Sequence, residues 1–336
     1  MHGDFILKAA KELEMSPEEI LDFASNINPF PPGDLEEVII RAARKARYYP
    51  ENSYLELKRA VAEHLGCEKK EVVIGNGSIE LIDAFFRLNK SDTVTTVMIP
   101  YPTFTEYERY ALVYGFHILY LPCSSDVLTD NAADVSVMCN PNNPTGDLFN
   151  LKDFRASKPF LIDEAFIDFV ENCEAPCEGE NFIVRSLTKI LAIPGLRFGY
   201  GRFPESFALK FERIRSPWHV NVVAMEVALH YLPDLNSFSR KVRKVIAKER
   251  SWLIQQLAKM RLECKGTANF LLVKAPFDAE ELFKFLYTRG ILIRTCRDFR
   301  GLGSGHFRIA VRSRPENEKL VESIREFTEF GEYEKL

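Results

Sequence analysis

The sequence predicts an α/β fold: a large domain built on a mostly parallel sheet of seven strands, and a small α+β domain. Two observations support this prediction. Between residues 72 and 203, short apolar runs alternate with turns and helical stretches, and after residue 205 a long charged stretch precedes strands and helices in mixed order. A chain of 336 residues is also long enough for about two domains. We expect the large domain over 45–225 and the small domain from 1–44 together with 226–336.

The N-terminal segment is expected to join the C-terminal part of the chain. Residues 4–14 have the pattern of a short helix, and Ser16–Glu19 is a capping box with proline at the first helical position, which predicts a second helix. The stretch Asp22–Gly33 contains three prolines and should be extended. Because residues 1–40 have too little apolar surface to fold alone, we expect them to pack on the small domain.

The other elements are predicted from apolar runs bounded by turn formers. Helices are expected over 35–46 and from Tyr54 to about Leu65. The seven expected strands are Val72–Ile74, Val94–Ile99, Phe116–Leu121, Val135–Cys139, Phe160–Ile162, Ile183–Arg185 and Tyr200–Phe203, with helices at 78–88 and 104–114. Later elements are a helix over Asp234–Lys259, strand Asn269–Lys274, helix Ala279–Arg289, strands Ile291–Arg294 and Phe307–Val311, and a helix from Glu316.

Composition and charge exclude several classes of function. A net charge of -4 without a basic stripe argues against nucleic acid as the main partner. No apolar run reaches about 18 residues, and the first residues lack the charged and apolar regions of a signal peptide. We therefore expect a soluble, cytoplasmic protein that does not bind a membrane. The seven cysteines are dispersed, and the one close pair, Cys173 and Cys177, lacks further zinc ligands, so we expect reduced thiols and no metal.

The stretch Arg185–Gly201 has the residue types that bind a phosphate-bearing aldehyde. Lys189 lies among apolar residues, where a poorly hydrated ammonium loses its proton more easily and becomes a nucleophile. Ser186 adds a hydroxyl, and Arg197 is a fork-shaped donor suited to a phosphate. The alternative for Lys189 is a solvated surface lysine, and for a lone Ser-x-x-Lys that alternative is the better interpretation.

Three further segments could complete such a site. Gly75–Glu80 follows a strand and opens a helix, so its first N–H groups could bind a phosphate, although a plain strand-to-helix turn fits the same residues. Asn143 follows another strand and could donate to a phenolate oxygen; the alternative is a proline-rich turn. Asp163 ends a third strand and could pair with a protonated pyridine nitrogen. A metal bound by Asp163 and Glu164 is the rival interpretation, but no histidine is nearby.

These pieces occur in one order, and that order resembles the fold-type-I pyridoxal-phosphate enzymes related to aspartate aminotransferase over nearly the whole chain. The resemblance implies pyridoxal 5'-phosphate as cofactor and a homodimer. Lys189 would be the catalytic residue that forms the Schiff base, Asp163 would meet the pyridine nitrogen, and Asn143 the 3-oxygen. The residues implied at the phosphate are Gly77, Ser78, Ile79, Ser186 and Arg197, with Tyr54 reaching it from the partner subunit. Phe104 would stack on the ring, and Phe166 stands where aminotransferases usually have a tyrosine that donates to the 3-oxygen.

Within this family, several segments are more similar to the threonine-phosphate decarboxylases of cobalamin synthesis than to the histidinol-phosphate aminotransferases. These segments are Leu21–Pro29, Asp163–Phe169, Arg185–Arg197, Pro217–Asn221 and Ile291–Cys296. The similarity implies a phosphorylated amino acid as substrate, whose carboxylate and phosphate would be held by His2, Asn28, Arg294 and Arg308. The two arginines could instead be surface charges at strand ends, and Asn28 could simply cap a turn. A histidinol-phosphate aminotransferase on the same scaffold is the alternative function.

Overall fold

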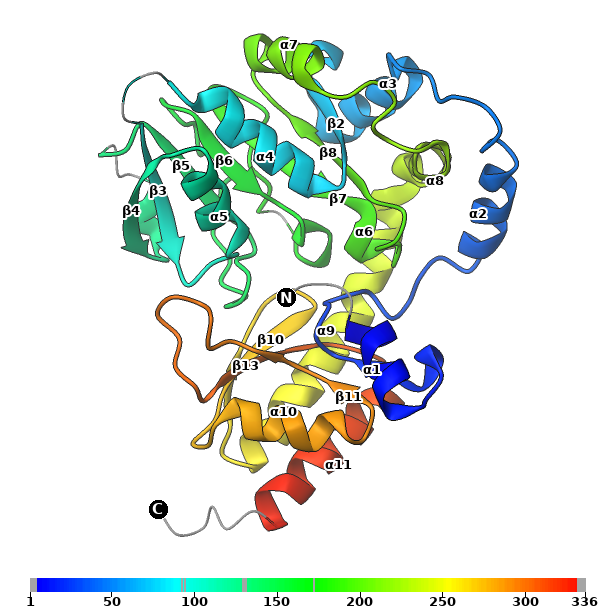
Figure 1. Cartoon of the computed structure of the whole chain (residues 1–336), viewed down its shortest axis with the longest axis vertical. Coiled ribbons are helices and arrows are strands. Elements are labelled where there is room, and N and C mark those ends of the chain that lie inside the picture. The colour runs from blue at the N-terminus through cyan, green and yellow to red at the C-terminus, as the bar shows by residue number, and fades with distance from the viewer. Residues whose placement is uncertain (1–4, 92, 94, 129–131, 172, 331–336) are drawn as a thin grey trace.

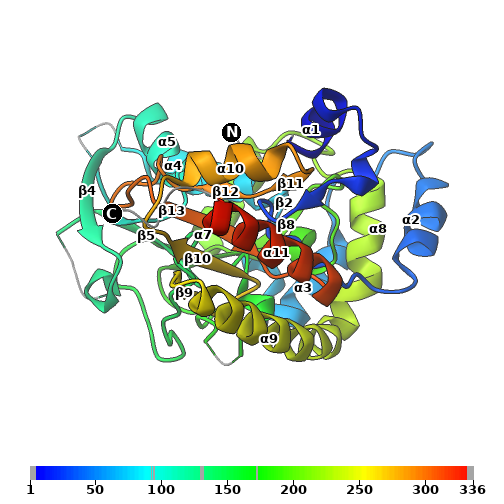
Figure 2. The ribbon, with the colours of Figure 1, turned by 90° about the horizontal axis from the view of Figure 1, so that it is seen from below.

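The computed structural model describes residues 5–91, 93, 95–128, 132–171 and 173–330. A large sheet with its helices occupies one end of the molecule, and smaller sheets with α10 (Ala279–Tyr287) and α11 (Arg314–Phe330) occupy the other (Figure 1). The long helix α9 (Leu235–Lys259) runs alongside both ends and packs on β9 (Glu263–Lys265), a strand of the four-stranded small sheet. Seen from below, α9, α10 and α11 lie beside one another (Figure 2). No helix in the described residues combines the length and the apolar character needed to cross a membrane.

The large sheet contains all seven predicted strands. Its order is β2-β8-β7-β6-β5-β3-β4, and β8 is antiparallel to both neighbours while the other pairs are parallel. The prediction of a mostly parallel seven-stranded sheet is confirmed. The bounds are β2 Val72–Asn76, β3 Thr96–Tyr101, β4 His117–Pro122, β5 Val135–Cys139, β6 Phe160–Asp163, β7 Asn181–Ser186 and β8 Phe198–Arg202.

The inner strands of this sheet are buried on both faces. In β5, Val135 and Val137 join one hydrophobic cluster with α4 and α5, whereas Met138, pointing to the opposite face, joins another. The sequence of such a strand is a nearly continuous apolar run, because successive side chains point to opposite faces and both faces are covered.

The described residues contain eleven α-helices and five short 3-10 helices. Helices α6, α7 and α8 were not predicted from the sequence. The α-helices are α1 Phe5–Leu13, α2 Leu35–Ala43, α3 Leu55–Leu65, α4 Ser78–Asn89, α5 Glu106–Val113, α6 Leu187–Ile190, α7 Glu205–Ile214, α8 Val222–Tyr231, α9 Leu235–Lys259, α10 Ala279–Tyr287 and α11 Arg314–Phe330. The 3-10 helices are η1 Pro17–Glu19, η2 Lys69–Glu71, η3 Ser125–Leu128, η4 Ile167–Phe169 and η5 Leu232–Asp234. No helix connects β5 to β6, and all the residues between these two strands are described.

The predicted second helix after Ser16 was wrong, because only the single turn η1 forms there. The Ser16 N–H does donate to the Glu19 carboxylate, at 2.8 Å, as a capping box requires. However, Ile20 is extended (φ −76°, ψ 122°), and the chain continues as strand β1, Leu21–Asp22, which pairs in parallel with β11, Ile291–Leu292. Tertiary pairing therefore ends the helix after one turn.

The C-terminal strands form a four-stranded antiparallel sheet in the order β12-β13-β10-β9. The prediction of one strand over Ile291–Arg294 was wrong: its first half, β11, pairs with β1, and its second half belongs to the four-stranded sheet. The N-terminal strand is thus paired with a C-terminal one, while the domain boundaries near residues 45 and 225 remain a prediction. The four strands are β9 Glu263–Lys265, β10 Phe270–Lys274, β12 Arg294–Thr295 and β13 His306–Ala310.

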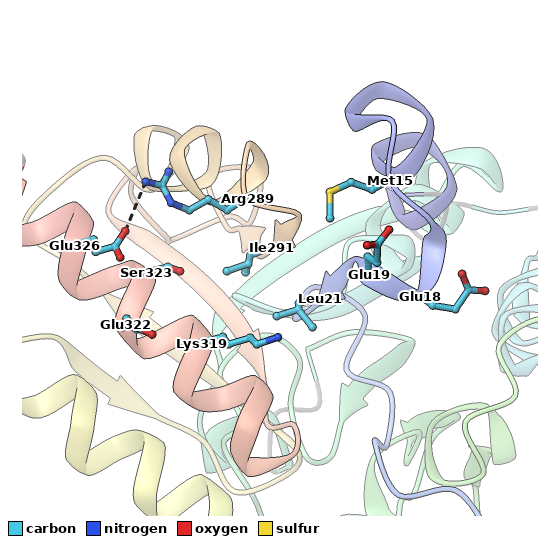
Figure 3. A pocket seen from close by; sticks show the side chains of 10 residues that line it. All are labelled: Met15, Glu18, Glu19, Leu21, Arg289, Ile291, Lys319, Glu322, Ser323 and Glu326. Atoms are coloured by element: carbon cyan, nitrogen blue, oxygen red, sulfur yellow. Dashed lines mark ion pairs between the residues drawn. The ribbon is translucent and has the colours of Figure 1, made fainter.

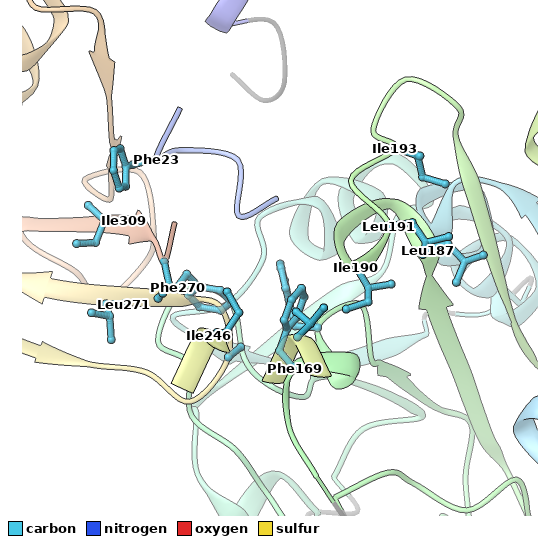
Figure 4. Close-up of a cluster of buried hydrophobic side chains, with 14 of the residues drawn as sticks. Phe23, Phe169, Leu187, Ile190, Leu191, Ile193, Ile246, Phe270, Leu271 and Ile309 are labelled. Carbon is cyan, nitrogen blue, oxygen red and sulfur yellow. The ribbon is translucent and has the colours of Figure 1, made fainter. Parts of the chain in front are cut away.

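One hydrophobic cluster connects the two sheets. It extends from Leu187 and Ile190 through Phe169 and Ile246 to Phe270 in β10 (Figure 4). Leu187 and Ile190 belong to α6, the single helical turn that carries Lys189, so the apolar surroundings expected for this lysine are present. The cluster fixes this turn between the large sheet and the small one.

Candidate active site

The candidate site lies at the carboxyl ends of β5, β6 and β7. These strands are parallel neighbours, and the register pairs Cys139 with Asp163 and Asp163 with Val184. The residues that follow each strand are therefore brought to one edge of the sheet, where open α/β sheets bind ligands. This edge collects the predicted residues Asn143, Asp163 and Lys189 from three separate motifs.

The residues predicted to bind a phosphate come together as a cradle where α4 begins beside β8. Gly77 has φ +79°, and a Cβ there would overlap the guanidinium of Arg197, so that guanidinium lies against the glycine. Ser78 and Ile79 open α4, whose N-terminus presents N–H groups and the positive end of the helix dipole. Ser186, at the end of β7, lies on the other side of the cradle. It pairs with Gly199, and Gly199 packs so closely on the Ser78 backbone that a Cβ would collide there.

Arg197 is held in an unusual backbone conformation. Its φ of +59° lies in the left-handed region, which costs a non-glycine residue of order 1–3 kcal/mol. Such a cost persists only where the surrounding structure enforces it. Here the conformation places the guanidinium on Gly77, and the sequence-predicted phosphate residues come together as a result.

The surroundings of Lys189 favour its free amine, the form that acts as a nucleophile. Its Nζ donates to the carbonyl oxygen of Ser25 at 2.8 Å. Burial, then the charge of Arg308, lowers its pKa to about 8; Arg197 adds to this shift and Asp22 opposes it. At pH 7 a pKa of about 8 leaves about a tenth of the lysine as free amine, whereas an ordinary lysine has about 0.03%.

This pKa predicts how Lys189 reacts with pyridoxal phosphate, the cofactor that the sequence resemblance implies. Because only the free amine attacks an aldehyde, the capture rate of pyridoxal phosphate by cofactor-free protein should rise with pH and level off above a midpoint near 8, instead of near 10.5. Stopped-flow absorbance between pH 6 and 10 measures this rate, and the Lys189→Ala variant supplies the background. A midpoint at or above 10 would contradict the lowered pKa.

Asp163 and Glu164 have different partners although they are adjacent in sequence. Asp163 is buried; its Oδ2 accepts from the Tyr107 hydroxyl at 2.7 Å and its Oδ1 from the Ala165 N–H at 3.0 Å. Burial raises the pKa of Asp163, and these hydrogen bonds oppose that shift. Glu164 instead pairs with Arg185 at 2.8 Å.

Two arginines stand next to each other on the small sheet facing this edge. Arg308 in β13 is buried, its Nη1 donates to Asn143 Oδ1, and its Nη2 donates to the Ala24 carbonyl at 2.5 Å. Arg294 in β12 is its partner across the strands and pairs with Asp298 at 2.6 Å. Among the described residues, the Nε atoms of both arginines are buried without a hydrogen-bond partner. Burial lowers the pKa of Arg308 to about 10, and the positive charge of Arg294 adds to this shift. The pair is therefore suited to an anion that supplies the missing acceptors.

Three other predicted residues lie around the same edge. The Asn28 N–H donates to the Lys189 carbonyl at 3.0 Å, but its side-chain amide donates to the carbonyls of Phe30 and Ile190. Asn28 thus fixes the chain beside Lys189, and its contact with substrate remains a prediction. Phe104 packs edge-to-face on Tyr107, with ring centroids 5.5 Å apart. Phe166 packs against Phe270 at 4.9 Å.

The prediction that Tyr54 reaches a partner subunit needs correction. Its side chain is only 1% exposed, its hydroxyl lies 3.3 Å from His219 Nδ1, and the Arg215 guanidinium stacks on its ring. These contacts place Tyr54 in the core of its own subunit, so it cannot also project outward. His2, the remaining predicted site residue, lies outside the described residues.

The sequence interpretation missed two groups that contact the site. Tyr107 donates to Asp163, and the main chain at Ser25 accepts from Lys189. A signal for Tyr107 exists, since it follows Phe104 by three residues and such a spacing can put two side chains on one face. No sequence signal identifies Ser25, because its contribution is a backbone carbonyl.

A cavity of about 500 Å³ opens away from this edge, between η1, β11 and α11 (Figure 3). Its charged lining consists of Glu18, Glu19, Glu322 and Glu326 against Arg289 and Lys319, and Arg289 is 3.6 Å from Glu326. A mainly acidic lining repels a phosphorylated substrate. None of the predicted site residues that the structure describes lines this cavity.

Comparisons with known proteins agree with this geometry. The family of class I and II aminotransferases matches residues 18–324. Threonine-phosphate decarboxylase of Salmonella typhimurium is 32% identical, covering 96% of this chain and 95% of its own. Histidinol-phosphate aminotransferase 2 of Archaeoglobus fulgidus is 31% identical, covering 92% and 93%. Histidinol-phosphate aminotransferase of Sinorhizobium meliloti, solved with pyridoxal-5'-phosphate, superposes with a TM-score of 0.85 at 19% identity, over 98% of this chain and 95% of that one.

Proposed function

This chain belongs to the aminotransferase class I and II family, and on that premise we propose that it decarboxylates L-threonine O-3-phosphate. The product would be (R)-1-amino-2-propanol O-2-phosphate, the linker used in cobalamin synthesis. The cofactor is pyridoxal 5'-phosphate, which supplies an electron sink for the bonds at the substrate α-carbon.

The residues present fit this cofactor. The cradle of Gly77, Ser78, Ile79, Ser186 and Arg197 suits its phosphate, because a Cβ at Gly77 would fill the space in front of the Arg197 guanidinium. Asp163 would meet the pyridine nitrogen and Asn143 the 3-oxygen, while Phe104 would stack on the ring and Phe166 would leave one donor missing.

Lys189 has two roles in the proposal. It binds the cofactor aldehyde, and once replaced by the substrate amine it returns a proton to the α-carbon after carbon dioxide has left. A pKa of about 8 suits both roles, because the free amine and the ammonium are both populated near neutral pH. The carbonyl of Ser25 accepts a hydrogen bond from its Nζ and so orients it.

The pair of Arg294 and Arg308 is the observation that carries the choice of substrate. L-Threonine phosphate has two anionic groups close together, a carboxylate and a phosphate. Two adjacent guanidiniums, one buried and one partly buried, each with an unsatisfied Nε atom, match that pattern. Histidinol phosphate has a single anionic group. The second candidate remains a histidinol-phosphate aminotransferase, favoured by relatives of nearly equal identity, since the dicarboxylate 2-oxoglutarate would suit the same arginines.

A product assay separates the two functions. We expect holoenzyme supplied with L-threonine phosphate to release carbon dioxide, and enzyme supplied with histidinol phosphate and 2-oxoglutarate to form no glutamate. L-Serine phosphate, which lacks only a methyl group, should also be decarboxylated. Glutamate formation without carbon dioxide release would assign the aminotransferase function instead.

The proposal includes a cytoplasmic homodimer. Apolar side chains are exposed on and around the segment between α2 and α3, where the Tyr49 and Trp218 rings lie 4.9 Å apart. Exposed apolar groups gathered in this way are typical of a protein interface. Two nearby tyrosines, Tyr48 and Tyr49, are 66% and 82% exposed. Unlike the buried Tyr54, they would be able to contact a second subunit. Light scattering of the purified protein should give the mass of two chains; a monomer would refute this part of the proposal.

A further inference from the structure

Tyr107 is a buried residue on α5 that the proposed function does not use. Its side chain is fully buried, and its hydroxyl donates to Asp163 Oδ2 at 2.7 Å. The same ring contacts Phe104 edge-to-face. Tyr107 therefore touches both predicted cofactor contacts on this side of the site, the carboxylate for the pyridine nitrogen and the ring for stacking.

We propose that Tyr107 is a positioning residue for the cofactor: its hydroxyl orients the Asp163 carboxylate and keeps it ionised. The proposal rests on the predicted role of Asp163 opposite the pyridine nitrogen. It applies equally to a decarboxylase and to an aminotransferase, because both need that nitrogen protonated to withdraw electrons.

The surroundings of Asp163 give the hydroxyl this role. Within the described part of the chain, the titratable groups that face Asp163 are Tyr107 and the thiol of Cys139, and no cation is among them. The Cys139 thiol donates to the Pro141 carbonyl at 3.2 Å. Burial raises the pKa of Asp163, and the Tyr107 hydroxyl is the first of two donors that lower it. A donor held to a carboxylate in a water-poor site stabilises the charged form and fixes its direction.

The orientation of the carboxylate is fixed from both sides. Oδ1 accepts from the Ala165 N–H and Oδ2 from Tyr107, so rotation about the last side-chain bond would break both hydrogen bonds. Without the hydroxyl, Oδ2 would have only the cofactor to hold it. Tyr107 itself is held by the edge-to-face contact with Phe104 and by the hydrophobic cluster that contains α5.

The test is Tyr107→Phe, which removes the hydroxyl and keeps the ring. We expect the affinity of cofactor-free protein for pyridoxal phosphate, measured by fluorescence quenching, to fall about 10- to 100-fold, the usual range for a hydrogen bond to a charged group. A less positive pyridine ring also withdraws fewer electrons. The Lys189 nitrogen joined to the cofactor should therefore keep its proton to higher pH, which raises the midpoint of the pH titration of the visible absorption band.

Tyr114→Phe is a matched control. Tyr114 follows α5 directly, and its hydroxyl also donates to a carboxylate, that of Asp83, at 2.8 Å, but neither residue is part of the site. This variant should keep the cofactor affinity and the absorption midpoint of the unmodified protein. Equal changes in both variants would show a general effect of losing a tyrosine hydroxyl from this region and would overturn the proposal.

A comparison in the Asp163→Asn background completes the test. If Tyr107 acts through Asp163, adding Tyr107→Phe to Asp163→Asn should change cofactor affinity less than twofold. The double variant leaves a neutral amide where Tyr107→Phe alone leaves a carboxylate short of a donor, so the comparison stands even where Tyr107→Phe alone folds poorly. A tenfold further loss in that background, or unchanged affinity in folded Tyr107→Phe, would overturn the proposal. Asp163→Asn alone tests the role of Asp163, and the product assay tests the reaction independently.

Discussion

Replacing Lys189 by alanine is expected to lower turnover by at least about 1,000-fold and to abolish covalent capture of the cofactor. In the proposed function, the variant loses both the nucleophile and the amine that returns a proton to the substrate. Its apolar neighbours in α6, Leu187 and Ile190, remain, so the protein should fold. Removing a poorly solvated charge should even favour the folded state at neutral pH, because the pKa of Lys189 is lowered to about 8 and its protonated form is disfavoured by burial.

Two measurements make this result specific. Borohydride treatment of the unmodified holoenzyme should fix the cofactor on the peptide that contains Lys189, which mass spectrometry identifies, whereas the variant should show no fixation. Lys152→Ala is the control, because Lys152 is exposed and should be dispensable. Added methylamine should restore part of the activity of Lys189→Ala by supplying an amine in solution. Full activity of Lys189→Ala without added amine would end the catalytic assignment.

The sequence predicted the large sheet well because its signals are local. Strands such as Val135–Cys139 are apolar runs covered on both faces, and turn residues bound them. The carboxyl ends of parallel neighbours share one edge, so motifs after three such strands could be expected to meet. The positions of Asn143, Asp163 and Lys189 on that edge follow from this geometry.

The parts that the sequence did not predict depend on distant contacts. The helix after Ser16 stops because β1 pairs with β11, some 270 residues away. The strand over Ile291–Arg294 divides between two sheets for the same reason. Tyr54 was assigned to a partner subunit, but Arg215 and His219 hold it inside its own. Contacts between residues that are distant in the sequence decide whether a tyrosine points inward or outward. Local sequence patterns do not contain this information.

The second large effect is expected from Glu164→Gln. Glu164 has no exposed surface, its carboxylate pairs with Arg185 at 2.8 Å, and it also accepts from the Ala175 N–H at 2.7 Å. The glutamine keeps the shape but leaves the Arg185 charge buried without its partner. We expect the free energy of unfolding, measured by urea denaturation followed by circular dichroism, to fall by about 3–5 kcal/mol. The pair joins the segment after β6 to β7, so the strand ends that carry Asp163 and Ser186 should loosen together.

An exposed ion pair and a double substitution separate charge from packing. Glu178 pairs with Arg155 at 2.5 Å on the surface, and Glu178→Gln should cost at most about 1 kcal/mol.

Burial raises the pKa of Glu164 in spite of Arg185, so desolvation costs this carboxylate more than the pairing returns. Burial also lowers the pKa of Arg185, but the charge of Glu164 helps to hold this pKa above its ordinary value. Without Glu164, the charge of Arg185 is therefore costly to keep in the protein. Glu164→Leu combined with Arg185→Met should therefore recover most of the stability that Glu164→Gln loses. Equal losses in the buried and exposed single variants would contradict this account, since they would show that Arg185 reaches water once its partner is gone.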